Sequence, residues 1–250
     1  METASTGRFI VYDTVLAPPV PQAPPLAPPT AADRERGLFD LLLRGQDRLT
    51  ALLTDERELP GIIQQMLGLS VFGMAVHGLV VGLAAQFLAG CTTHLALGHA
   101  ALWMPLAFPL AFLGAVCICL PSFYFYTQLA GLDASFRLVT AQALRAQATT
   151  SVLLLGVLPF YAAIALTCAV GIVDQADLVL LAGMALPFLT GLFGISAVHD
   201  GFLALARVLP ITHARRGNVL GRLVLCWGAV YSVIAPVALY RISEALQKLL

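Results

Sequence analysis

The sequence predicts an all-α, polytopic membrane protein with five transmembrane helices, preceded by an amphipathic cytoplasmic helix. Hydrophobic residues make up 59% of its 250 positions and charged residues only 11%, whereas soluble domains average roughly 45–50% and about 25%. Fifteen of the 28 charged side chains lie within residues 1–60, and five long apolar stretches follow. This pattern excludes an ordinary soluble domain, a disordered chain and a nucleic-acid binder with a global basic field.

The first 59 residues divide into two segments. Residues 1–32 are predicted to be a Pro-rich disordered tail, because seven prolines fall within positions 18–29 and favour extended, unpaired backbone. Residues 33–59 are predicted to form a helix with mixed charges on one face, so we expect it to lie on the membrane surface or against a partner helix. Its apolar positions recur close to a 3.6-residue period, at Leu38, Leu41, Leu42, Leu49, Leu52 and Leu53.

Residues 60–250 are predicted to form a five-helix transmembrane domain. A helix needs about 20 apolar residues to cross a hydrocarbon core about 30 Å thick, and only a helix pairs all its backbone polar groups within such a segment. The stretches that meet this requirement are approximately 67–89, 100–120, 150–172, 178–198 and 223–242.

The basic residues predict the orientation. With five spans, the N-terminal region, the 121–149 loop and the 199–222 loop share one side and carry 12 of the 14 basic residues. Because basic loops stay in the cytoplasm, the N-terminus is predicted to be cytoplasmic and the C-terminus outside. Thirteen of the 14 basic residues are arginine, and with abundant alanine and leucine this is typical of GC-rich bacteria, so the membrane is predicted to be a bacterial inner membrane.

Both basic cytoplasmic loops contain candidate lipid contacts. Residues 134–147 are predicted to form a short surface helix, with Arg137 and Arg145 toward phosphates. The residues expected to face lipid are Phe136, Leu138, Val139 and Leu144. The second basic group lies in and around the 199–222 loop, where basic side chains bind lipid headgroups or anchor the topology. Its members are Arg207, His213, Arg215, Arg216 and Arg222.

His77 and Gln86 are the most polar residues of the first span. A buried ionisable residue in a membrane indicates a functional site, but the spans contain no Asp or Glu between their ends to complete a proton relay. His77 adjoins Gly78 and Gly82, a small-residue spacing that lets a second helix approach closely. We therefore favour an interhelical hydrogen bond for His77, with a polar path for a solute as the alternative.

The first external loop contains Cys91, His94 and His99, spaced as Cys-x2-His-x4-His. These side chains can hold a metal such as zinc with an open fourth position. However, the spacing matches no known signature, and no carboxylate lies nearby to act as a catalytic base. We interpret them as ordinary loop residues and predict no metal and no cofactor.

Two motifs suggest enzymes, but neither has the arrangement of residues that its chemistry needs. The segment from Asp200 to Arg207 resembles the start of the CDP-alcohol phosphatidyltransferase motif, but the Ala-Arg pair is displaced by two residues and the two further aspartates are absent. Ser196, His199 and Asp200 are the residue types of a hydrolase triad, but a triad needs converging side chains rather than neighbours in sequence. The sequence therefore predicts no catalysis.

The layout resembles that of Yip1-domain membrane proteins, which have a cytoplasmic, often Pro-rich N-terminal region, five spans and a short C-terminus on the far side. Local features agree: Gly131 and Ser135-Phe136-Arg137 lead into a span containing Pro159, and residues 194–199 lead into a segment that ends at 204–206. The resemblance covers residues 65–242 and implies a non-enzymatic membrane protein that acts by interaction.

Together these patterns predict an integral membrane anchor, scaffold or accessory subunit. Polar residues are concentrated in residues 1–59, so a protein partner is expected to bind there, while the bilayer surrounds the rest. No nucleic acid is expected. The alternative is a small transporter or channel subunit with a polar path near His77; because five spans are few for this, it would be a homo-oligomer.

Overall fold

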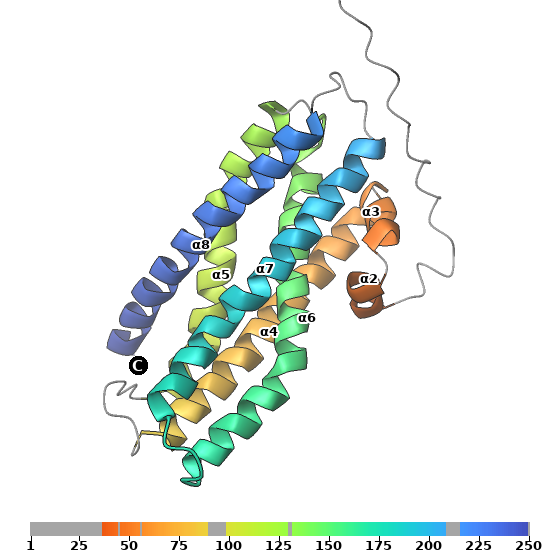
Figure 1. Ribbon diagram of the computed structural model, residues 1–250. Coiled ribbons are helices and arrows are strands. Elements are labelled where there is room, and N and C mark those ends of the chain that lie inside the picture. The colour runs from red at the N-terminus through yellow and green to blue at the C-terminus, as the bar shows by residue number, and fades with distance from the viewer. Residues whose placement is uncertain are drawn as a thin grey trace, which may run out of the picture.

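The computed structural model describes residues 37–44, 46–55, 57–89, 99–129, 132–208 and 216–249, and within them all regular structure is helical. Five long helices are long and apolar enough to cross a membrane, which confirms the all-α class and the five predicted spans (Figure 1). Two short helices precede them. In chain order the elements are α2 (Leu38–Arg44), α3 (Gln46–Leu53), α4 (Leu59–Phe87), α5 (Ala100–Leu129), α6 (Phe136–Ala169), α7 (Ala176–Val208) and α8 (Arg216–Leu249).

The long helices extend past the predicted spans. They contain 29 to 34 residues, so at a rise of 1.5 Å per residue they are roughly 44–51 Å long, more than the hydrocarbon core requires. The largest difference is at α6, which begins at Phe136 rather than near 150. Helices of this length extend past a hydrocarbon core about 30 Å thick unless they are strongly tilted.

The five long helices pack side by side in the order α8, α5, α4, α6, α7, and α7 also contacts α8. Figure 1 shows α5 and α8 together on one side of the bundle and α6 and α7 on the other. Consecutive helices run in opposite directions, so the start of α4, the end of α5 and the start of α6 lie at the same end. The end of α7 and the start of α8 lie there too.

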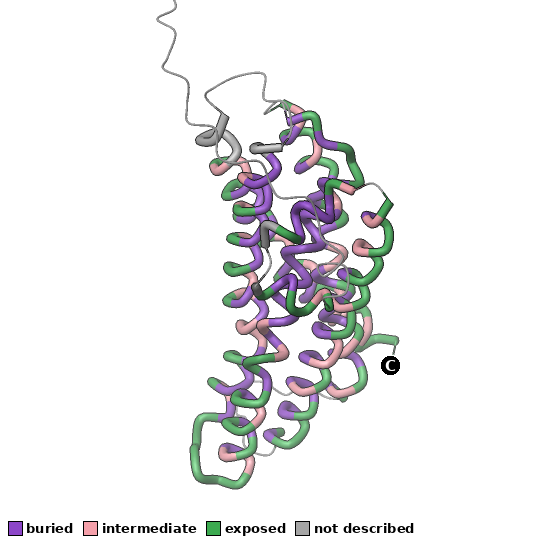
Figure 2. The backbone as a smooth tube through the Cα atoms, turned by 90° about the vertical axis from the view of Figure 1, so that its right-hand side faces the viewer, coloured by how far each residue is buried: buried purple, intermediate pink, exposed green. Residues whose placement is uncertain are grey.

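Apolar side chains fill the interior and also cover the outside. Phe108 and Phe123 are fully buried, while Phe87 and Phe160 are more than 70% exposed. Figure 2 shows the buried residues on the inward sides of the helices and the exposed ones outward. An outer surface this apolar fits contact with lipid, because soluble monomers rarely expose large contiguous apolar areas.

Helices α4 and α5 touch at the two glycines singled out in the sequence. A Cβ added to Gly78 would lie 2.8 Å from the carbonyl carbon of Met104, and one added to Gly82 would lie 2.7 Å from the carbonyl oxygen of Ala100. These separations are shorter than a van der Waals contact, so only glycine allows the two backbones to approach this closely.

The prediction of helical structure ahead of the spans fits the described part of the segment 33–59. Two short helices are described there, α2 and α3, and they pack against α4, α6 and α7 of the same chain. Five of the six leucines of the predicted apolar face are buried: Leu41, Leu42, Leu49, Leu52 and Leu53. The surface that this face covers is thus the bundle itself.

The predicted surface helix at 134–147 is corrected. This segment is the first part of α6 and continues into the third span without a break. Leu138 and Leu144 are 7% exposed and Arg145 is 1% exposed, so these side chains lie inside the protein rather than against lipid. The prediction assumed that one face was free, whereas α2, α4 and α7 contact this helix.

We expect Gly78→Ala to destabilise the bundle by about 1–3 kcal/mol, because the added methyl group must push the α5 backbone away. The matched control is Gly68→Ala on the same helix, where a Cβ meets nothing within 4 Å and alanine should add about 0.5–1 kcal/mol of stability. Unfolding of the purified proteins in detergent, followed by circular dichroism, measures both. Equal shifts in the two variants would contradict the close contact of α4 with α5.

Candidate functional site: the buried polar half of α6

A polar stretch in the first half of α6 is almost completely enclosed by the protein. From Leu138 to Val152 every residue of α6 except Thr140 is buried. Four alanines in this stretch leave room for neighbouring helices to approach. The polar side chains therefore point into the protein: Gln142, Arg145, Gln147, Thr149, Thr150 and Ser151.

Arg145 joins the N-terminal segment to the bundle. Its Nη1 donates a hydrogen bond to Oγ1 of Thr50 on α3 at 3.0 Å, and Thr50 is fully buried. On the third side lies Gly201 of α7, where a Cβ would come within 2.8 Å of the same Nη1 and also meet the Gln142 amide oxygen. The guanidinium thus lies where α3, α6 and α7 meet.

Further polar contacts connect α6 to the other long helices. Gln147 Nε2 donates to the Tyr231 hydroxyl of α8 at 2.7 Å, and Ser151 Oγ donates to the carbonyl oxygen of Ser70 on α4 at 3.3 Å. Each bond satisfies a polar group that would otherwise be costly inside a membrane protein. These side chains therefore hold helices together.

The cavity beside Gln147 is small. It has a volume of about 10 Å³ and is lined by residues of α5 to α8, among them Thr150, Trp227 and Tyr231. That is room for about one water molecule. The polar half of α6 thus encloses no space for a larger solute at this point.

His77 makes an interhelical contact of the kind favoured from the sequence. Its Nε2 lies 3.0 Å from the carbonyl oxygen of Gly183 on α7, so this nitrogen carries the proton when the bond is formed. The ring packs edge-on against Phe108 of α5, with centroids 5.1 Å apart. Gln86, nine residues further along α4, is exposed and takes no part in this contact.

The metal candidates are not brought together in the described part of the chain. Cys91 and His94 lie outside the described residues. His99 directly precedes α5 with a positive φ of 51°, and its carbonyl oxygen accepts a hydrogen bond from the Leu102 amide. Within the described ranges no group of three His, Cys, Asp or Glu side chains could hold a metal ion.

The basic group near the α7–α8 connection is described only in part. His213 and Arg215 lie outside the described residues, and for Arg207 and Arg216 only the helical backbone is described. Arg222 is exposed on the second turn of α8 and lines a groove between α5 and α8.

The residue types of the hydrolase triad do not form a relay. His199 Nδ1 lies 3.5 Å from Asp200 Oδ1, and both side chains are more than one-third exposed. The other ring nitrogen, Nε2, faces Gly221 of α8, where a Cβ would lie 3.3 Å away. The nitrogen that would have to activate Ser196 is thus turned toward another helix.

Sequence reasoning missed the role of the polar half of α6. Its charged groups suggested a surface segment. The available signal for burial was the run of alanines, threonines and serines, which is typical of helices packed closely inside membranes. The partners Thr50 and Tyr231 are 95 and 84 residues away from Arg145 and Gln147, so no local pattern identifies them.

We expect Thr50→Val to destabilise the protein by about 1–3 kcal/mol, because a buried guanidinium donor loses its acceptor. Thr140→Val is the matched control, since the Thr140 hydroxyl bonds only the Phe136 carbonyl of its own helix and should shift stability by less than about 0.5 kcal/mol. Thermal unfolding in detergent gives both values. A Thr50→Val protein as stable as the control would show that α3 is not held through Arg145.

No known protein family, curated protein or solved structure matches this chain.

Proposed function

We propose that the protein is an integral membrane anchor or scaffold, without catalytic activity, whose N-terminal region presents a binding segment to a protein partner. The observation that carries the proposal is the attachment of α2 and α3 to the bundle. Their leucines pack on α4, α6 and α7, and Thr50 meets the buried Arg145. A partner held by residues 1–36 would therefore be tied to a rigid membrane unit.

Such a partner would bind the side chains of the N-terminal segment that the bundle leaves exposed. Phe39 and Leu43 of α2 remain 50% and 47% exposed, beside the point where residues 1–36 join the helix. The segment before α2 contains Pro-x-x-Pro spacings, such as Pro18 and Pro21, and segments of this kind dock into aromatic-lined grooves of partner proteins. The lipid bilayer is the other partner, since five apolar helices face it.

The proposal includes an orientation, with the N-terminus in the cytoplasm and the C-terminus outside, in a bacterial inner membrane. Supporting this, the start of α4, the end of α5, the start of α6, the end of α7 and the start of α8 share one end of the bundle (Figure 1). Twelve of the 14 basic residues belong to the N-terminal region and to the sequence ranges 121–149 and 199–222 that contain these helix ends, the arrangement expected for cytoplasmic segments.

The likeness to Yip1-domain proteins, which act by interaction, agrees with this proposal and remains a prediction. The alternative, a homo-oligomeric transporter or channel subunit, also remains a prediction. The surroundings of His77 favour the anchor, because its ring is closed in by Phe108 and by the Gly183 carbonyl, and neither described cavity is lined by it. Solute flux in proteoliposomes that is lost in His77→Leu would reverse this preference.

Deletion of residues 1–36 is expected to abolish recovery of the partner while leaving membrane insertion and thermal stability unchanged, because α2 and α3 stay seated on the bundle. Phe39→Ser should weaken recovery in the same direction. The measurement is native mass spectrometry of complexes extracted from the protein's own membrane in mild detergent.

The matched control for Phe39→Ser is Phe136→Ser on α6, which is 48% exposed and lies outside the N-terminal segment. It should leave recovery unchanged. Full recovery of a partner by the deletion variant, or recovery of a pure homo-oligomer by every variant, would contradict the proposal.

A further inference from the structure

A groove of about 600 Å³ runs along the outside of the bundle between the second half of α5 and the first half of α8. Its floor contains Phe123 and Trp227, whose rings stack with centroids 4.7 Å apart. Its length follows from two residues of α8 at its ends, Arg222 and Ile234. They are twelve positions apart, or roughly 18 Å along the helix.

The walls of the groove are apolar and open toward the surroundings of the bundle. Ile118 and Val230, which line it, are 63% and 53% exposed, so the groove faces lipid rather than another helix. Trp227 is 6% exposed, and its indole N–H has no hydrogen-bond partner among the described residues. The groove therefore offers a long apolar surface above a buried tryptophan ring.

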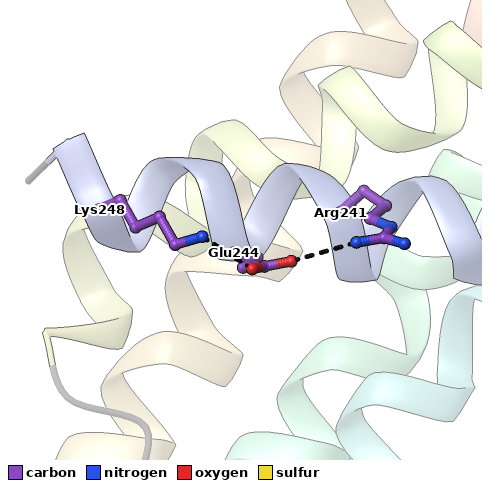
Figure 3. A network of polar contacts seen from close by, with 3 residues as sticks. All are labelled: Arg241, Glu244 and Lys248. Carbon is purple, nitrogen blue, oxygen red and sulfur yellow. Dashed lines mark hydrogen bonds and ion pairs between the residues drawn. The ribbon is translucent and has the colours of Figure 1, made fainter.

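A single positively charged side chain, that of Arg222, lies at one end of the groove. Arg222 lines it, no Asp or Glu does, and none of the carboxylates in the described part of the chain pairs with this guanidinium. The opposite end of α8 is different. There Glu244 accepts from both Arg241, at 3.5 Å, and Lys248, at 2.8 Å (Figure 3).

We propose that this groove binds one acyl chain of an anionic phospholipid, with the lipid phosphate at Arg222. The volume lies within the roughly 300–1,000 Å³ typical of ligand sites, which are mainly apolar with a few polar groups. The 18 Å length matches one leaflet, about half of a hydrocarbon core about 30 Å thick. A guanidinium at headgroup depth attracts anionic lipid and forms paired hydrogen bonds with phosphate oxygens.

A second copy of the chain is a poorer occupant. In a symmetric dimer the same surface of both subunits meets, so the two Arg222 side chains would approach each other across a groove that contains no acidic residue. The proposal goes beyond the anchor function and does not depend on it, because all groove residues belong to α5 and α8.

The test uses Trp227 as the reporter. The chain contains two tryptophans, and Trp103→Phe leaves Trp227 as the only one. This full-length protein is placed in phosphatidylcholine bilayers that contain a minor fraction of lipid with brominated acyl chains, either phosphatidylglycerol or phosphatidylcholine. Bromine on a chain in the groove quenches the indole fluorescence by contact.

We expect the brominated phosphatidylglycerol to quench with an apparent affinity about fivefold higher than the brominated phosphatidylcholine, the preference that one arginine near the surface supplies. Arg222→Gln should remove this preference. The matched control Arg241→Gln should keep it, because Arg241 lies at the other end of α8 and is already paired with Glu244.

A second pair of variants tests the groove itself. Val230→Phe fills it and should reduce quenching by both lipids, whereas Val237→Phe, on the same helix and 57% exposed but outside the groove, should not. If Val230→Phe does not fold, as judged by gel filtration, the two arginine variants still decide the question, because both side chains are exposed.

Four results would overturn the proposal. The first is equal quenching by the two brominated lipids, and the second is an unchanged preference in Arg222→Gln. The third is loss of the preference on adding inorganic phosphate at constant ionic strength, which would assign Arg222 to a free anion. The fourth is loss of quenching as the protein-to-lipid ratio rises, which would assign the groove to a second copy of the chain.

Discussion

A guanidinium cannot be enclosed in a protein without partners, because removing its charge from water costs several kcal/mol. Arg145 is 1% exposed, and much of the structure around it follows from that constraint. Thr50 is brought to it by α3, and α7 passes it at Gly201, where a Cβ would lie 2.8 Å from the guanidinium Nη1 and would require the guanidinium to shift. The N-terminal helices are thereby part of the bundle's packing and not an appendage.

This constraint also determines what the N-terminal region can offer to other molecules. Five of the six leucines that recur periodically in this segment are buried within the protein. A partner of the proposed kind would meet the outward face of α2, where Phe39 and Leu43 are exposed. The two described helices of this segment follow different parts of the bundle surface, α2 contacting α6 and α3 contacting α7.

The parts of the fold that the sequence predicted are those with local causes. Five apolar stretches gave five helices because the hydrocarbon core demands about 20 apolar residues from each, and the spacing of Gly78 and Gly82 identified a close helix contact. The prediction for the start of α6 was wrong because this part of the helix is buried by helices that are distant in sequence. The same holds for the α5–α8 groove, whose two walls lie about 100 residues apart.

The position of α8 in the bundle has a consequence for how the protein is assembled. This helix packs mainly on α5 and to a smaller extent on α7, and it is synthesised after the other four long helices. Until it arrives, the Gln147 amide has no Tyr231 hydroxyl to bond, and the ring of Phe123 has no Trp227 to stack on. The first four helices can therefore enter the bilayer as two antiparallel pairs, but their interior becomes complete only when the C-terminal helix closes it.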